Sequence, residues 1–251
     1  MPKIAVANQK GGVGKTTTVI NLGAALAELG AKVLLIDLDP QGSLSLGLGV
    51  SDAEVTIADV LAQEGMSLTD AILDLGGGLD LVAADVSLAD VELPLLNRPG
   101  RETMLRQKLS QPARRYGYVL VDCPPSLSLL TIMGLVAADS VIVPVQCEYF
   151  ALKGLERLLT TVAKVKQELN PRLTIAGILP TMYDSRTIHS REVLEELQRG
   201  YEGQVFNTVV PKRVATADAT IAGESVLTFA PQSQTAEAYR SLAREVHGKE
   251  A

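Results

Sequence analysis

Residues 8–18, NQKGGVGKTTT, have the composition of a phosphate-binding loop. The glycines between positions 11 and 14 permit a tight turn whose backbone amides face a ligand, and a helix expected from residue 15 adds its positive dipole end. In such loops a lysine reaches the β and γ phosphates and the next hydroxyl holds Mg²⁺, which assigns these tasks to Lys15 and Thr16. The loop therefore predicts a bound nucleoside triphosphate with Mg²⁺.

The expected nucleotide contacts continue along the loop into the helix. Thr17 is placed to donate a hydrogen bond to the α phosphate. The candidate phosphate-binding residues are Lys10, Gly11, Gly12, Val13, Gly14, Lys15, Thr16 and Thr17.

Two acidic positions follow apolar segments that are predicted to be strands. VLLID leads into DLDPQG, which contains Asp39, and YVLVD ends in Asp122 before Cys-Pro-Pro. Open parallel sheets bind ligands at the carboxyl ends of their strands, so both carboxylates are expected near the loop. Asp122 occupies a Walker B position, which supports Mg²⁺ through its water shell, and Asp39 is a second carboxylate for the water around the metal. This order of elements predicts a nucleotide hydrolase.

The loop departs from the general pattern at its start. The pattern requires glycine where this chain has Gln9, and a second lysine, Lys10, comes next. Because Lys15 already serves the phosphates, a further lysine for the same nucleotide is largely redundant. Lys10 is either a cation brought to a second subunit's nucleotide, as an arginine finger is, or an ordinary solvated lysine.

Apolar segments alternate with helix-like segments along most of the 251 residues. Strands are expected at 3–7, 32–37, 79–84, 118–122, 140–145 and 173–179, and helices at 15–29, 101–110, 126–137, 151–169 and 187–199. This alternation predicts an α/β fold with a doubly wound, mainly parallel sheet and helices on both faces. The length favours a single domain spanning 1–251, in which residues 47–61 and 76–78 form surface loops and short helices.

Composition narrows the functional classes. The formal charge of −6 argues against an obvious nucleic-acid binder, and Cys123 and Cys147 form no CxxC pair, so free buried thiols are expected. The N-terminus lacks the pattern of a signal peptide, and no apolar run reaches the length of a membrane helix, which predicts a cytoplasmic protein. The segment 235–248 is an amphipathic helix expected to dock on the body of the protein, and it lacks the lysines of a membrane-surface helix.

KGGVGKTT, DLDPQG and VDCPPS together resemble the deviant Walker A class of P-loop ATPases, specifically the ParA/Soj group that partitions chromosomes and plasmids. PVQCEYFALKGL at 144–155, PTMYDSRT at 180–187 and VVPKRV at 209–214 match in order and spacing, so the resemblance covers essentially the whole chain.

The resemblance implies roles for individual residues. Lys10 would reach across a nucleotide sandwich dimer to the partner's ATP, and Asp39 would orient the attacking water. Asp122 would belong to a second switch, while Met182 and Pro211 would contact the adenine base.

The resemblance also implies a cycle. ATP would drive homodimerisation, the dimer would bind nucleoid DNA without sequence preference, and a ParB-type centromere-binding partner would stimulate hydrolysis. A small basic patch is sufficient for such DNA binding despite the net charge, and its candidates are Arg186, Lys212 and Arg213. ATADATIAG follows VVPKRV where the family commonly has a segment like RLSEAPSHG, and no helix-turn-helix extension precedes the loop.

Three other functions share parts of this pattern. A MinD-like membrane-associated positioning ATPase has the same loop and switches but needs a membrane-binding tail. An electron carrier similar to nitrogenase reductase needs cluster-ligand cysteines, and neither Cys123 nor Cys147 lies in a matching loop. A non-enzymatic nucleotide switch would not need Asp39.

Overall fold

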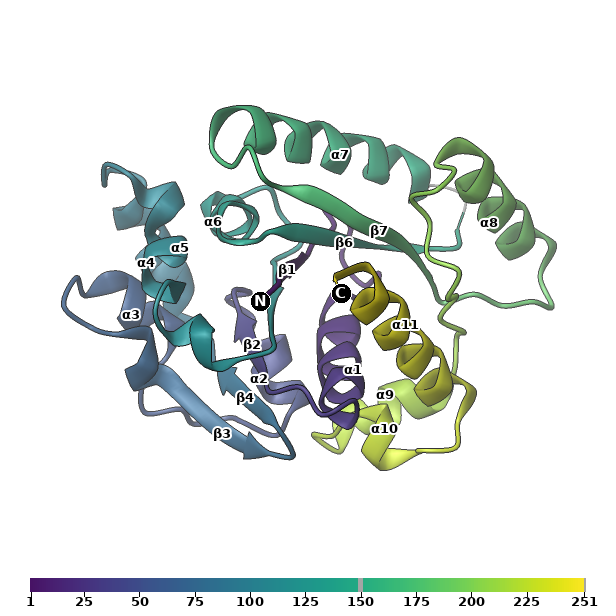
Figure 1. The fold of residues 1–251 in the computed structure, drawn as a ribbon, viewed down its shortest axis with the longest axis horizontal. Coiled ribbons are helices and arrows are strands. Elements are labelled where there is room, and N and C mark those ends of the chain that lie inside the picture. The colour runs from purple at the N-terminus through teal and green to yellow at the C-terminus, as the bar shows by residue number, and fades with distance from the viewer. Residues whose placement is uncertain (149–150, 251) are drawn as a thin grey trace.

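The computed structural model describes residues 1–148 and 151–250 of the 251-residue chain, and Figure 1 shows helices packed on both sides of one twisted sheet. The sheet has seven strands in the order β3-β4-β2-β5-β1-β6-β7. The strands are β1 (Lys3–Val6), β2 (Val33–Asp37), β3 (Ile72–Gly76), β4 (Leu79–Val82), β5 (Tyr118–Asp122), β6 (Ser140–Gln146) and β7 (Thr174–Thr181). All neighbouring strands are parallel except β3 and β4. The predicted doubly wound, mainly parallel α/β fold is confirmed.

Helices cover both faces of this sheet. The α-helices are α1 (Lys15–Glu28), α2 (Ser43–Gly47), α3 (Ile57–Ala62), α4 (Ser87–Leu95), α5 (Met104–Leu109), α6 (Leu129–Ala137), α7 (Ala151–Glu168), α8 (Ile188–Gly200), α9 (Val214–Ile221), α10 (Val226–Phe229) and α11 (Gln234–Glu250). Short 3₁₀ turns occur at Leu68–Ala71, Arg101–Thr103 and Pro112–Arg115.

Strand residues alternate between two hydrophobic cores. Leu34 and Ile36 of β2 join the core beneath α3 to α8, whereas Val33 and Leu35 join the core beneath α1, α10 and α11. This period of two is what a strand buried on both faces requires. The predicted apolar stripe of α11 is buried in the second core, with Tyr239 only 1% exposed.

The parallel register brings the strand ends to a common edge. Asp37, the last residue of β2, pairs with Asp122, the last residue of β5, and Val6 at the end of β1 pairs with the same aspartate. The glycine loop leaves β1 at this edge and enters α1, so the fold places the loop and the acidic strand ends together.

Several elements differ from the sequence-based prediction. The strand predicted at 79–84 is present as β4, but it pairs antiparallel with β3, an edge strand at Ile72–Gly76 that was not predicted. The helix predicted at 101–110 is a 3₁₀ turn followed by α5, and the one predicted at 126–137 begins at Leu129. Ser128, at the N-cap of α6, has extended backbone angles that end the preceding loop. Cys123 and Cys147 are free and buried, as predicted.

Candidate nucleotide site

The glycine loop has the backbone geometry that its sequence requires. Gly12 and Gly14 have φ angles of +71° and +90°, a left-handed conformation that side chains with a Cβ rarely adopt. Gly14 caps α1, which leaves the first amides of this helix pointing into the loop. The loop therefore offers unpaired N–H donors at a positive helix end, the usual setting for phosphate.

Lys15 is held inside the loop, with only 6% of its surface exposed. Its Nζ donates to the carbonyl oxygen of Lys10 at 3.3 Å. Burial lowers the pKa of Lys15, while the nearby charges of Asp122 and Asp39 raise it. A cation in this partly desolvated position interacts strongly with phosphate, as predicted for the lysine of the loop.

Thr16 and Asp122 meet directly, as the strand order predicts. Thr16 Oγ1 donates to Asp122 Oδ2 at 2.6 Å, and the other carboxylate oxygen, Oδ1, is buried with no hydrogen-bond partner among the described residues. Burial, with the charge of Asp37 second, raises the pKa of Asp122 well above its usual range. An unsatisfied carboxylate oxygen beside a hydroxyl fits hydrated Mg²⁺, which prefers oxygen ligands and retains several waters.

Asp37 and Asp39 have separate environments that the DLD motif does not reveal. Asp37 is fully buried and accepts hydrogen bonds from the amides of Asp39, Leu44 and Ser45 and from the Ser45 hydroxyl. Burial raises the pKa of Asp37 to about 6, although these hydrogen bonds lower it. The Asp39 side chain accepts one hydrogen bond from the described residues, from the Gln41 amide to Oδ1 at 3.0 Å, and keeps acceptor capacity for a ligand or water. Asp37 thus positions the backbone that presents Asp39.

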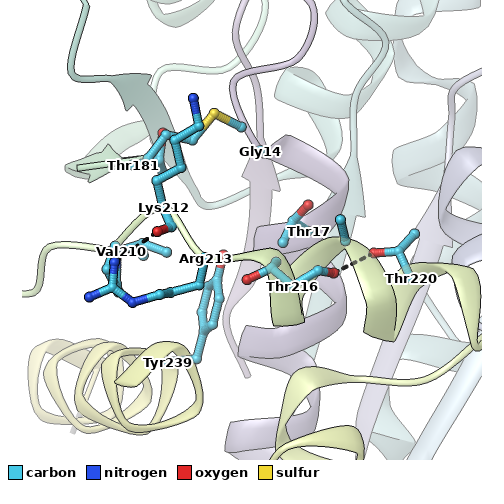
Figure 2. A pocket seen from close by; sticks show the side chains of 12 residues that line it. Gly14, Thr17, Thr181, Val210, Lys212, Arg213, Thr216, Thr220 and Tyr239 are labelled. Carbon is cyan, nitrogen blue, oxygen red and sulfur yellow. Dashed lines mark hydrogen bonds between the residues drawn. The ribbon is translucent and has the colours of Figure 1, made fainter. Parts of the chain in front are cut away.

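A cavity of about 250 Å³ opens beside the loop and is shown in Figure 2. Its wall joins the start of α1 to the end of β7, the following 210–213 segment and α9. Its lining residues are Gly14, Thr17, Thr181, Met182, Val210, Pro211, Lys212, Arg213, Thr216, Ala217, Thr220 and Tyr239. Met182 and Pro211, which the resemblance assigns to the adenine base, both line this mostly apolar cavity, whose size suits a nucleobase.

Backbone contacts fix the shape of this cavity. Val210 N donates to Pro180 O at 2.9 Å, and Tyr183 exchanges hydrogen bonds with Val210 O and Lys212 N at 3.1 and 3.0 Å. Met182, between these contacts, has a φ of +52°, the one left-handed non-glycine residue in the described chain. Such a conformation is held only where the surroundings determine it. Figure 2 shows Thr17 of α1 near Thr216 and Thr220 of α9. The sequence predicted a role for Thr17 but none for the two α9 threonines.

Comparison with known proteins identifies the family. A family model described as an AAA domain matches residues 1–175. The sporulation initiation inhibitor protein Soj of Bacillus subtilis (strain 168) is 44% identical over 245 residues, which cover 97% of this chain and 97% of Soj. The chromosome partitioning protein ParA of Caulobacter vibrioides (strain NA1000 / CB15N) is 45% identical over 251 residues, covering 98% and 94%. This chain belongs to the ParA/Soj family of P-loop ATPases.

A solved structure supports the cofactors of this ParA/Soj chain. The crystal structure of cobyrinic acid a,c-diamide synthase from Mycobacterium smegmatis with bound ADP and magnesium has a TM-score of 0.86 and 42% identity, covering 97% of this chain and 92% of that one. The ParA/Soj chain is accordingly an ATPase that uses ATP and Mg²⁺. Its Thr16–Asp122 pair and its glycine loop are the residues that fit these two ligands.

The side-chain amine of Lys10 in this ParA/Soj chain has different partners from that of Lys15, although the Lys10 carbonyl accepts from Lys15 Nζ. Lys10 Nζ is 3.2 Å from Gln146 Oε1 and 3.4 Å from Glu148 Oε2, and the Lys10 side chain is 40% exposed. Gln146 Nε2 in turn donates to Glu148 Oε1 at 2.6 Å. Gln146 is the last residue of β6 and Glu148 follows it, both within the 144–155 segment, whose residues 149–150 lie outside the described chain.

Two of the three basic residues proposed for DNA, Lys212 and Arg213, line the cavity, and Arg186 is not among its lining residues. Arg213 Nη1 donates to Lys212 O at 2.9 Å. Arg186 is exposed and forms two hydrogen bonds with Asp184, at 2.9 and 2.8 Å. The Arg186 contacts lower the pKa of Asp184, and the charge of Arg213 adds to this effect. Arg186 is therefore paired with Asp184, whereas the Arg213 guanidinium contacts Lys212 O and Gln234 Oε1.

Proposed function

We propose that this chain is a DNA-partitioning ATPase whose ATP-bound homodimer binds DNA without sequence preference and is released after hydrolysis. The supporting observation is the extent of similarity: Soj and ParA are matched over 97% and 94% of their own lengths at 44% and 45% identity. Every motif that carries chemistry lies within the matched region.

The geometry supports a division of labour at the nucleotide. Lys15 and the loop amides hold the phosphates, Thr17 the α phosphate, and Thr16 and Asp122 keep hydrated Mg²⁺ in place. Mg²⁺ neutralises charge that develops on the phosphate oxygens. Asp39, aligned by the Asp37 contacts with the backbone, orients the attacking water. Met182 and Pro211 contact the base.

Lys10 completes the site of the opposite subunit in this proposal. Among the described residues, the Lys10 amine contacts Gln146 in a part-buried position and Glu148 in an exposed one. Exchanging these partners for the other subunit's phosphates therefore breaks no fully buried contact of the described chain. Bringing a cation to the transferred phosphoryl group from a second subunit makes hydrolysis depend on dimerisation.

DNA binding in this proposal uses Arg186, Lys212 and Arg213. Lys212 and Arg213 line the cavity proposed for the base, which supports an effect of nucleotide binding on the surface that meets DNA phosphates. Two copies in a dimer double a patch that is small in one chain, and counterion release makes such binding strongly salt-dependent. A ParB-type centromere-binding protein is the proposed activator, and the proposed location is the cytoplasm, on the nucleoid.

Two other functions are less well supported. None of the described helices is both long enough and apolar enough to span a membrane. A MinD-like protein would instead bind membranes through an amphipathic tail, whereas the apolar stripe of α11 packs into the core. The name of the M. smegmatis protein denotes an amide-forming reaction, but the chromosome partitioning protein ParA of C. vibrioides matches at slightly higher identity, 45%, over 94% of its length.

The proposal is tested by ATP-dependent retention on DNA, with the oligomeric state read by light scattering. Wild type is compared with Lys10→Ala and Asp39→Ala, and with Arg106→Ala on the exposed side of α5 as a control that also removes one exposed positive charge. We expect Asp39→Ala to remain a DNA-bound dimer and Lys10→Ala not to form the wild-type complex. Monomeric proteins that ignore DNA in every case would reject the partition function.

A further inference from the structure

The outer face of α4 is apolar although it is exposed to solvent. Val86 is 74% exposed, Leu93 69% and Leu96 46%, and Ala89 is exposed between them. Their spacing of three or four residues places them on one side of the helix. The opposite side carries Leu88, Val91 and Leu95, which pack into the core beneath α3 to α8, so the exposed stripe is not needed to anchor α4.

Carboxylates flank this stripe. Asp85, Asp90 and Glu92 lie within the same turns, and neither Asp90 nor Glu92 forms an ion pair with any described residue. The nearest arginines in sequence follow the helix, and both donate to backbone carbonyl oxygens. Arg98 donates to Ala62 O and Arg101 donates to Leu96 O. An apolar stripe with a rim of unpaired charge is typical of a protein-binding surface.

The negative charge of the rim, formed by Asp85, Asp90 and Glu92, indicates the chemistry of the partner. DNA and anionic lipid surfaces are repelled by carboxylates, whereas a cationic helix with one apolar side satisfies both the stripe and its rim. We propose that the Val86–Ala89–Leu93–Leu96 face of α4 docks a cationic amphipathic helix of a partner protein.

The start of α4 is connected to the segment that carries Asp39. Ala84 N donates to Ser45 Oγ at 3.0 Å, and that hydroxyl donates to Asp37 Oδ2 at 2.9 Å. A Cβ on Gly42 would lie 2.7 Å from Ala84 O, so the backbones are in close contact. A helix docked on Val86 would therefore lie two residues along the chain from Ala84, which contacts the residues that position Asp39. This consequence for hydrolysis rests on the proposed function, whereas the docking itself does not.

The test uses a fluorescently labelled Leu/Lys peptide designed as an amphipathic helix, titrated with the full chain by anisotropy. Leu93→Lys places a like charge in the centre of the stripe and is expected to raise Kd about tenfold, the usual effect of losing a central interface contact. Ile221→Lys, at an equally exposed apolar residue on α9, is the matched control and should bind as wild type.

A second pair of variants isolates the charge of the rim. Asp90→Asn is expected to weaken binding a few-fold and to reduce its salt dependence, while Asp218→Asn on α9 leaves both unchanged. Equal binding by Leu93→Lys and Ile221→Lys, or equal binding of a Leu/Glu peptide, overturns the proposal. The proposal is also overturned if the protein self-associates without nucleotide and Leu93→Lys abolishes this self-association. The stripe would then bind a second copy of this chain instead of a different protein.

The same preparations separate this inference from the proposed function. Peptide-free ATP hydrolysis and DNA retention by wild type test the partition ATPase. If these fail while the α4-dependent Kd shift persists, the docking surface stands and the partition function falls. Stimulation of hydrolysis by the peptide in wild type, absent in Leu93→Lys, supports the link from α4 to Asp39.

Discussion

Lys10 Nζ lies 3.4 Å from Glu148 Oε2, so the second lysine of the glycine loop is paired within its own chain. The proposed dimer requires this lysine to leave Glu148 for the phosphates of the other subunit. The ion pair and the proposed dimer contact are therefore competing interactions of one side chain, and the structure shows the first.

Removing the charge of Glu148 should favour the dimer. Glu148→Gln is expected to lower the protein concentration needed for ATP-dependent dimerisation by a few-fold, because exposed ion pairs contribute about 0.2–1 kcal/mol. Sedimentation velocity with ATP measures the shift, and Glu168→Gln at the exposed end of α7 is the control. An unchanged or weakened dimer would show that Glu148 does not compete for Lys10.

Asp122 should reduce the stability of the nucleotide-free protein. Its pKa is raised in the folded state, so the fold binds this proton more tightly than the unfolded chain does. The stabilisation from the protonated form is complete below the unfolded pKa, near 3.8, and is lost as pH rises toward the folded pKa. Asp122→Asn is therefore expected to raise Tm at pH 8 by a few degrees, about 2–4 °C per kcal/mol for a chain of this size.

The same variant should behave oppositely with ligand. Asp122→Asn removes a carboxylate proposed to support Mg²⁺, so the additional stabilisation that Mg²⁺ gives to the nucleotide complex should fall. Calorimetric scans with ATP, with and without Mg²⁺, measure both effects. A lower Tm without nucleotide would mean that Asp122 is satisfied in solution.

Asp37 and Asp39 should respond differently to the same change. Asp37→Asn replaces an acceptor oxygen with a donor among the amides of Asp39, Leu44 and Ser45, and leaves a buried donor unpaired. The expected cost is about 1–3 kcal/mol in the free energy of unfolding. Asp39→Asn should leave stability nearly unchanged and reduce ATP turnover. Denaturant titration beside a turnover assay compares them, and equal stabilities would contradict the structural role of Asp37.

Ala217 tests the location of the base. It lines the cavity and is exposed, so Ala217→Leu fills space there without disturbing the core. We expect the Kd for ATP to rise at least about tenfold, because adding a bulky side chain to a formed pocket excludes part of the ligand. Ala163→Leu on the exposed side of α7 controls for the substitution. Unchanged affinity, read by titration calorimetry, would place the base elsewhere.

Much of the arrangement around the nucleotide loop could be predicted from the sequence. It depends on the spacing of residues within the loop and on which residues end the neighbouring strands. Thr16 meets Asp122 because both lie at the carboxyl edge of neighbouring parallel strands. The partners of Lys10 were not predictable, because Gln146 and Glu148 lie 136 and 138 residues away. The fold also contains a β3 strand that the pattern does not reveal, because ILDLG is a partly exposed edge strand rather than a buried apolar run.

The contribution of α9 was missed for a different reason. VATADATI consists mainly of small residues and has one fully buried member, Ala219, so it lacks the strong apolar periodicity of a core helix. Its role as a cavity wall comes from tertiary packing. The two carboxylates of DLD are equivalent in sequence, and only the turn into α2 surrounds Asp37 with donors.

The pairing of Asp37 with Asp122 across β2 and β5 has a consequence for folding. A slip of one residue between these strands would turn every side chain of one strand to the wrong face and would separate the two aspartates. In the proposed site, nucleotide with Mg²⁺ therefore binds only chains in which β2 and β5 pair in the native register. A ligand that binds only the native state stabilises that state by mass action. ATP in the cell would therefore increase the population of chains with correctly paired strands.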